Sequence, residues 1–224
     1  VALPHAPAQL RGRVGQGYTT LTVLPVDGER RLTLRAEDAG EFLSAFDIVE
    51  TIRGGRLGVD GVVTGDELTD GLTMNARIDE YRVVNAPVLA QVLSVASFTG
   101  LADTLNGDGI RFSRLRVNLT MTPERIEARN GIAYGPGLGL KVEGAYDRKS
   151  ELIDFVGLLA PAYSLSRLID KIPVFGQLLT GGEGEGLLAT EFRVRGKIDD
   201  PQVAVNPLTA LAPGFLRELV STAE

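Results

Sequence analysis

The stretch LTDGLTMNARID, residues 68–79, carries the pattern that decides the fold class. Its apolar residues stand at even positions and alternate with polar ones; they are Leu68, Leu72, Met74, Ala76 and Ile78. Side chains of a β-strand point alternately to its two faces. The alternation therefore predicts a strand with one apolar and one polar face, as in an antiparallel sheet.

The same alternation recurs in residues 126–134, 138–146 and 188–198. Turn-forming clusters such as Gly135-Pro136-Gly137 separate the runs, so consecutive strands are expected to form hairpins. In the first run the predicted apolar face holds Ile126, Ala128, Ile132 and Tyr134. In residues 110–121 the apolar positions change from even to odd, which predicts a β-bulge near Ser113-Arg114.

Four segments favour helices. Asp38 followed by Glu41 resembles a capping box and predicts a short helix near 39–46. Asn85 is expected to be the N-cap of a helix that runs to Ala96. Two further helices are expected at 165–179 and 207–220, the second with Pro207 in its first turn.

The predicted fold is therefore mainly β with several short helices, arranged as an antiparallel meander with helices at its ends and edges. Four helices cannot cover about ten strands evenly. The strands either close into a two-layer sandwich or form a curved open sheet with an exposed apolar concave face. Periodicity alone does not choose between them, although sandwiches are the more common outcome.

Composition excludes several kinds of site. The chain has 224 residues, no Cys and a single His, His5, so thiol chemistry, disulfides and His-centred metal sites are not expected. A net charge of −6 argues against a dedicated nucleic-acid binder. Arg111, Arg114 and Arg116 are interpreted as a solvated strand face and not as a phosphate site. No nucleophile elbow or phosphate loop occurs, so we expect no enzymatic activity and no cofactor.

Residues 85–220 resemble the C-terminal region of the AsmA-like family of bacterial envelope proteins, which includes the YhdP and TamB relatives. The resemblance rests on NAPVLAQVLSVASFTGL at 85–101, GDGIRFSRLRVNL at 107–119 and the segment 161–219, which ends in NPLTALAPGFLREL. It divides the chain into residues 1–84, an N-terminal β segment, and residues 85–224. The second part is expected to hold a helix, a four-strand meander, a helix, two strands and a C-terminal helix, in one sheet continuous with the first.

The resemblance implies a curved, half-pipe sheet whose apolar concave face carries lipid. Such a protein is expected to be a segment of a periplasmic conduit that shields phospholipid acyl chains between the inner and outer membranes and so supports outer-membrane biogenesis. The parent protein is expected to be anchored in the inner membrane by an N-terminal helix that this chain lacks. Partners are then an acyl lipid, the envelope membranes and an outer-membrane or periplasmic protein, without nucleic acid.

Site residues follow from the same resemblance, because alternate strand positions line the groove in the family. The predicted lining consists of Leu115, Val117, Leu119, Ile126, Leu138, Leu140, Val142, Phe192 and Val194. The last two predicted helices either touch a membrane or partner, or plug the apolar face as core; their apolar residues are Leu165, Leu168, Phe175, Leu178, Leu211, Phe215 and Leu219. No catalytic or metal-binding residue is implied.

A second function from a different class stays open. TamB-type relatives suggest a periplasmic scaffold that assists outer-membrane protein assembly by pairing strands at a sheet edge. An apolar channel that is continuous through the chain favours the lipid conduit. A filled interior with an uncapped strand edge favours the scaffold.

Overall fold

The structure is a computed structural model of the 224-residue chain. It describes residues 7–26, 29–64, 71–96, 98–161 and 190–206, and the account below concerns these ranges. The predicted helices at 165–179 and 207–220 lie outside them. So do the seven apolar residues named above for a membrane or partner contact, together with Leu68 and Leu188.

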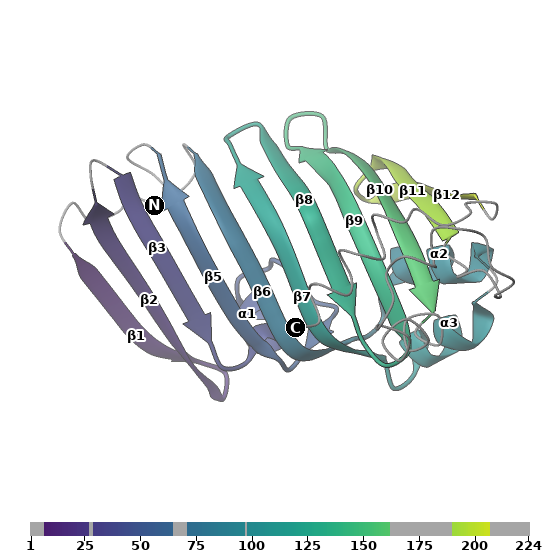
Figure 1. The fold of residues 1–224 in the computed structure, drawn as a ribbon, viewed down its shortest axis with the longest axis horizontal. Helices are drawn as coiled ribbons and strands as arrows, with labels where there is room; N and C mark the ends of the chain where they lie inside the picture. The colour runs from purple at the N-terminus through teal and green to yellow at the C-terminus, as the bar shows by residue number, and fades with distance from the viewer. Residues whose placement is uncertain (1–6, 27–28, 65–70, 97, 162–189, 207–224) are drawn as a thin grey trace, which may run out of the picture.

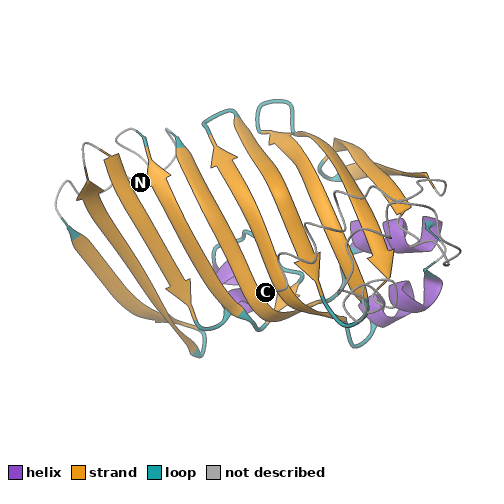
Figure 2. Cartoon of the chain, in the orientation of Figure 1, coloured by secondary structure: helices purple, strands orange, loops and turns teal. Residues whose placement is uncertain are grey.

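The described residues form one antiparallel sheet of twelve strands (Figures 1 and 2). The strands are β1 (Ala8–Val14), β2 (Gly17–Val26), β3 (Glu29–Ala36), β4 (Ile52–Arg53), β5 (Arg56–Val63), β6 (Leu72–Val83), β7 (Ile110–Met121), β8 (Arg125–Tyr134), β9 (Leu138–Asp147), β10 (Leu152–Pro161), β11 (Thr190–Lys197) and β12 (Asp200–Asn206). Each pairs with its neighbours in the chain, except that β4 pairs with β6 and β3 with β5. The sheet is open, because β1 and β12 do not pair with each other.

This arrangement confirms the mainly β antiparallel meander with short helices. A closed or two-layer sandwich is wrong for the described part of the chain, since all twelve strands belong to one unclosed sheet. The pairing of β6 with β7 also joins the strands on either side of residues 84–85 in that sheet.

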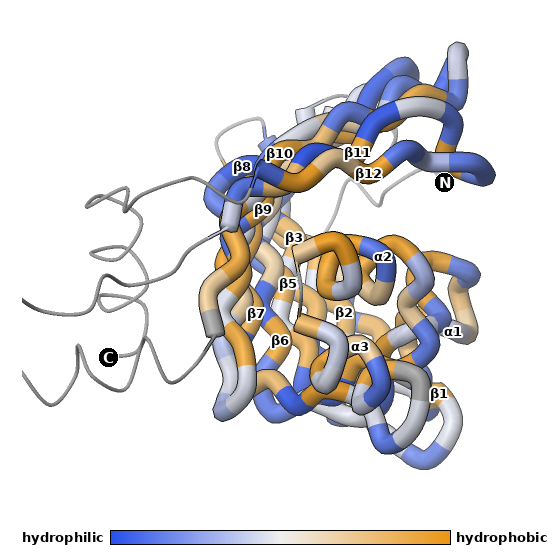
Figure 3. Tube along the Cα trace, turned by 90° about the vertical axis from the view of Figure 1, so that its right-hand side faces the viewer, coloured by the Kyte–Doolittle hydropathy of each residue, from blue (hydrophilic) through white to orange (hydrophobic). Residues whose placement is uncertain are grey.

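Three helices occur in the described ranges: α1 (Ala39–Ala45), α2 (Pro87–Val95) and α3 (Thr99–Asn106). The first follows β3, and the other two lie between β6 and β7. The register of the strands places these two connections at the same end of the sheet, here called the helix end. Figure 3 shows the helices on one side of the sheet, toward which β10, β11 and β12 bend.

The helix predicted near 39–46 is confirmed, but only half of its capping box forms. The Asp38 carboxylate accepts a hydrogen bond from the Glu41 N–H at 2.9 Å, which satisfies one free donor of the first turn. The Glu41 carboxylate does not return to Asp38. It accepts from the N–H of Gln16 at 2.6 Å and so ties α1 to the turn between β1 and β2.

The second predicted helix begins later than expected. Ala86 is the N-cap of α2 and makes no side-chain cap, whereas Asn85 lies one residue earlier with φ +48°. Asn tolerates this left-handed conformation, so the residue turns the chain and does not cap it. The helix α3 was not predicted, because its N-cap, Phe98, carries no capping group.

In β8 the predicted set of inward residues is wrong beyond Ala128. Asn130 adopts φ +51°, and the register to both neighbouring strands shifts by one residue there. The extra residue is a β-bulge that exchanges the two faces. Ala133 therefore pairs with Leu115 and Leu140 on the apolar side, and Ile132 and Tyr134 lie on the other face.

The change of face in β7 occurs where it was predicted, but without an extra residue relative to β6. Asp79 pairs with Arg114 and Tyr81 with Phe112, so the register is unbroken across Ser113. Glu80 stands opposite Ser113 with φ +53°. Both strands exchange faces at this level, and the rings of Tyr81 and Phe112 stack with centroids 5.3 Å apart.

The core lies between the helix end of the sheet and the helices. Leu93 of α2 and Leu105 of α3 are fully buried, and they belong to one cluster with Leu138, Leu159 and Phe192 of the sheet. A smaller cluster forms near the opposite end around Val23, Val63 and Leu72.

Gly157 provides a test of this packing. A Cβ there would overlap the Phe192 ring and the carbonyl oxygen of Lys141. We predict that Gly157→Ala lowers the free energy of unfolding by about 1–3 kcal/mol, because the overpacked strand must shift. Gly12→Ala is the matched control, since nothing lies within 4 Å of its Cβ position. Urea denaturation of both variants measures the difference, and equal stabilities would contradict the packing described.

Candidate functional site

One face of the sheet, here called the lining face, is the face to which the apolar side chains of the strands point. A first row of cross-strand neighbours crosses ten strands without a polar residue. It consists of Leu21, Leu34, Val59, Ala76, Val117, Gly131, Val142, Gly157, Phe192 and Val205. The residues are aligned by the strand pairing itself, and Gly131 takes its place through the bulge at Asn130.

A second row runs beside the first, two residues away along each strand except β8, where the bulge makes the separation three. It consists of Val23, Leu32, Gly61, Met74, Leu119, Ala128, Gly144, Phe155, Val194 and Val203. Strands lie about 4.8 Å apart, so two rows across ten strands form an uncharged band about 40 Å long.

All nine residues predicted to line a groove lie on this face. Leu138, Phe192 and Val194 are fully buried, with exposed fractions of 0%, 6% and 4%. The other six are half-buried; they are Leu115, Val117, Leu119, Ile126, Leu140 and Val142. The predicted set therefore divides into core residues and residues that keep part of their apolar surface exposed.

The helices explain this division. Leu93 and Leu105 pack in the same cluster as Leu138, so α2 and α3 cover the helix end of the lining face near that residue. Leu119 and Ile126 are neighbours of Met74 and Met121, which lie toward the opposite end of the strands. Neither Leu119 nor Ile126 belongs to the core cluster that contains the helices.

Sequence reasoning missed the lining residues of the first half of the chain. Leu21 and Val23 in β2, and Leu32 and Leu34 in β3, extend the two rows to the N-terminal side of the sheet. Their alternation with Thr20, Thr22 and Thr33 was present in the sequence. That alternation is the signal that identifies them.

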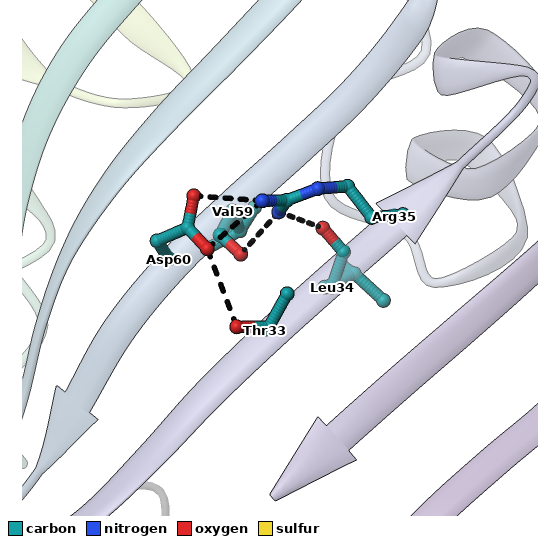
Figure 4. A network of polar contacts seen from close by, with 5 residues as sticks. All are labelled: Thr33, Leu34, Arg35, Val59 and Asp60. Carbon is teal, nitrogen blue, oxygen red and sulfur yellow. Dashed lines mark hydrogen bonds and ion pairs between the residues drawn. The ribbon is translucent and has the colours of Figure 1, made fainter.

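The opposite face is polar and carries ion pairs between neighbouring strands. The Arg35 guanidinium bridges from β3 to the Asp60 carboxylate of β5 at 2.9 Å, and Thr33 also donates to Asp60 (Figure 4). Arg193 of β11 forms a similar pair with Asp154 of β10. These pairs are largely exposed to solvent, so each contributes little to stability.

Asp79 holds the least exposed ion pairs of this face. Its two carboxylate oxygens accept from Arg77 Nε at 2.7 Å and from Arg114 Nε at 2.8 Å. Burial raises the pKa of Asp79, but the hydrogen bonds and charges of the two guanidinium groups outweigh burial. The pKa therefore lies below the ordinary value of 3.8.

The arrangement offers apolar surface on one face of the described sheet. The described ranges contain no group of three or more His, Cys, Asp or Glu side chains that could hold a metal ion. None of the helices described is long and apolar enough to span a membrane. What the lining face can do chemically is remove apolar ligand surface from water, at about 0.8 kcal/mol for each buried CH₂ group.

Comparison of the chain with protein-family models, with curated proteins and with solved structures finds no match.

The ion pairs of Asp79 give a pH-dependent prediction. A carboxyl group whose pKa is lowered by folding stabilises the folded state above its unfolded pKa, and this contribution is lost as the pH falls through the folded pKa. We predict that Asp79→Asn lowers the free energy of unfolding by about 1–2 kcal/mol at pH 7. The difference from the unsubstituted protein should shrink as the pH falls below 3.8.

Urea denaturation between pH 7 and pH 3 measures this difference. Asp60→Asn is the control, because the Asp60–Arg35 pair is mostly exposed and should change stability by less than about 1 kcal/mol at either pH. A difference for Asp79→Asn that does not vary with pH would contradict the role given to its charge.

Proposed function

We propose that the chain is a segment of a lipid conduit: its sheet forms a half-pipe groove, the lining face is the apolar concave surface, and phospholipid acyl chains lie along it. The observation that carries this proposal is the pair of uncharged rows that cross ten strands. A protein that needed only a core would bury such a band completely. Here Val117, Leu119 and Val142, which lie in the two rows, keep part of their surface exposed.

The dimensions of the band suit acyl chains. The hydrocarbon core of a bilayer is about 30 Å thick, so one acyl chain extends over about half of that length. A band about 40 Å long therefore exceeds a single chain and could receive more than one in succession. A chain of about 16 carbons would gain on the order of 10 kcal/mol from transfer out of water, before entropy costs.

The composition of the band favours a surface for sliding over a selective pocket. Its residues are mainly aliphatic, and neighbouring apolar side chains such as Phe155 and Phe192 fill the space over Gly144 and Gly157. No hydrogen-bonding side chain stands in either row to fix one ligand in one place. Such a surface holds acyl chains of many lengths with similar affinity, as transport requires.

The helices supply one boundary of the proposed groove. Both α2 and α3 pack on the helix end of the lining face, and the bend of β10–β12 brings those strands over the same side (Figure 3). Acyl chains would then run across the strands, along the two rows, and not along any single strand. The long axis of the conduit is accordingly the direction in which strands are added to the sheet.

The cellular setting follows from the family resemblance. On this proposal the conduit works in the periplasm, between an inner membrane in which the parent protein is anchored and an outer membrane that receives the lipid. The chain has no enzymatic role in this proposal and no cofactor.

A second function, strand pairing with outer-membrane proteins, is supported by the open edges of the sheet. Within the described ranges β1 pairs only with β2, and β12 only with β11. Yet Arg11 and Arg13 stand on β1, and charged side chains on an edge strand oppose pairing with another chain. Their guanidinium carbons lie 5.4 Å from the centre of the Tyr18 ring, which holds them over the neighbouring strand. We therefore prefer the lipid conduit.

Substitution of Leu119 tests the proposed groove. Leu119 lies half-buried in the second row of the lining face, and its neighbour Thr120 lies exposed on the opposite face of β7. We predict that the purified chain carries phospholipid in roughly stoichiometric amount, and that Leu119→Asp reduces it at least fivefold. A carboxylate beside an acyl chain must be desolvated without a partner, which is costly.

Mass spectrometry of extracted lipid measures this amount, after circular dichroism has shown each variant to be folded. Thr120→Asp adds the same charge on the other face and should leave bound lipid unchanged. Leu119→Asn serves if the aspartate variant does not fold. Absence of lipid from the folded chain, or equal lipid in the Leu119 and Thr120 variants, would contradict the proposal and favour the scaffold function.

A further inference from the structure

A row of three arginines crosses the polar face at the helix end of the sheet. Arg53 of β4 is the cross-strand neighbour of Arg82 of β6, and Arg82 is that of Arg111 of β7. Like charges directly opposite one another on a sheet are destabilising. Arg77 and Arg116 also stand directly opposite each other on this face, but Arg77 is ion-paired with Asp79, as Arg193 is with Asp154. The row therefore calls for an explanation other than the stability of the fold.

The three arginines line one pocket of about 600 Å³. It lies where Glu80 and Ser113 face each other, at the level where both strands exchange faces. Glu80 is the single acidic residue of its lining, against three arginines, so the lining residues carry a net charge of +2 (three minus one). The pocket is positive although the whole chain has a net charge of −6.

Two of the guanidinium groups are held in place by backbone carbonyls. Arg53 Nη1 donates to the carbonyl oxygens of Glu50 at 2.6 Å and of Ile52 at 3.0 Å. Arg82 Nη1 donates to the carbonyl oxygen of Asp108 at 3.1 Å. Each guanidinium has five N–H donors, so several stay available on each side chain. These contacts orient the groups without neutralising them.

We propose that this pocket binds a phosphate group, which replaces the interpretation of Arg111 as part of a solvated strand face. Arginine forks match the oxygens of a phosphate in bidentate geometry, and a tetrahedral anion can accept from three forks at once. The Ser113 hydroxyl in the lining adds a further donor. The phosphate belongs either to a phospholipid headgroup or to free phosphate, and only the first source rests on the proposed lipid function.

A ³¹P NMR titration tests the pocket with inorganic phosphate and with dihexanoyl phosphatidic acid, at constant ionic strength set with sodium chloride. We expect both to bind the unsubstituted chain. The double variant Arg82→Gln, Arg111→Gln should weaken binding of both at least tenfold, because each lost charge-assisted hydrogen bond has an effect of this order. Arg31→Gln removes the charge of an exposed arginine of β3 and should change the affinity less than twofold.

The outcomes separate the sources and the alternatives. If the phosphatidic acid binds more tightly than phosphate, and dihexanoylglycerol competes with neither, the ligand is a lipid headgroup. If the two bind equally, the pocket recognises the phosphate group alone. Failure of both to bind, or an equal loss in Arg31→Gln and the double variant, overturns the proposal. Leu119→Asp leaves this pocket intact, so failure of the lining face to hold lipid would leave the phosphate result unchanged.

Discussion

A one-layer sheet keeps an apolar face only if every strand pairing is in the register that sends apolar side chains to the same side. A shift by one residue in any pair would reverse the faces of all strands beyond it. Two irregularities in this sheet keep the apolar side chains of neighbouring strands on the same side. The extra residue Asn130 in β8 lets the residues on both sides of the bulge match the faces of β7 and β9. At Glu80 and Ser113 the paired strands β6 and β7 exchange faces at the same level, so they still agree with each other. Asn130 and Glu80 have positive φ although neither is a glycine, so the paired strands around them hold this conformation.

The helices cover part of the apolar face that a single sheet leaves exposed. In the described ranges α2 and α3 pack at the helix end, and Leu119, toward the opposite end, is not in the cluster that contains them. Residues such as Leu138 become core there, and residues such as Leu119 stay half-buried. Core residues and partly exposed apolar residues are thus two parts of one face. The division depends on how far the helices reach and not on any difference between the residue types.

Much of the sheet could be predicted from the sequence, because alternation in runs such as 138–146 leaves little choice of face. Prediction failed where a single residue changed the conformation of the backbone. Nothing in the sequence around Asn130 distinguishes a bulge from a regular strand, so the alternation predicts the wrong face for Ile132 and Tyr134. The helix α3 was missed because it begins at Phe98 without a capping side chain, and packing against α2 stabilises it instead.

The choice between open and closed sheets depends on contacts between distant strands, which alternation does not encode. The row of Arg53, Arg82 and Arg111 was also hidden, since its members are far apart in the chain.

The strand order has a consequence for how such a chain can form and change. Each strand of the main path pairs with the strands before and after it in the chain order, although pairings such as Leu72 with Met121 and Phe155 with Val194 join residues far apart in the sequence. The sheet resembles a linear repeat array, in which stability is close to a sum over adjacent units. Any hairpin can therefore begin folding, and its neighbours add to it on either side. The same locality means that a hairpin can be inserted or deleted within the array without reordering the strands on either side.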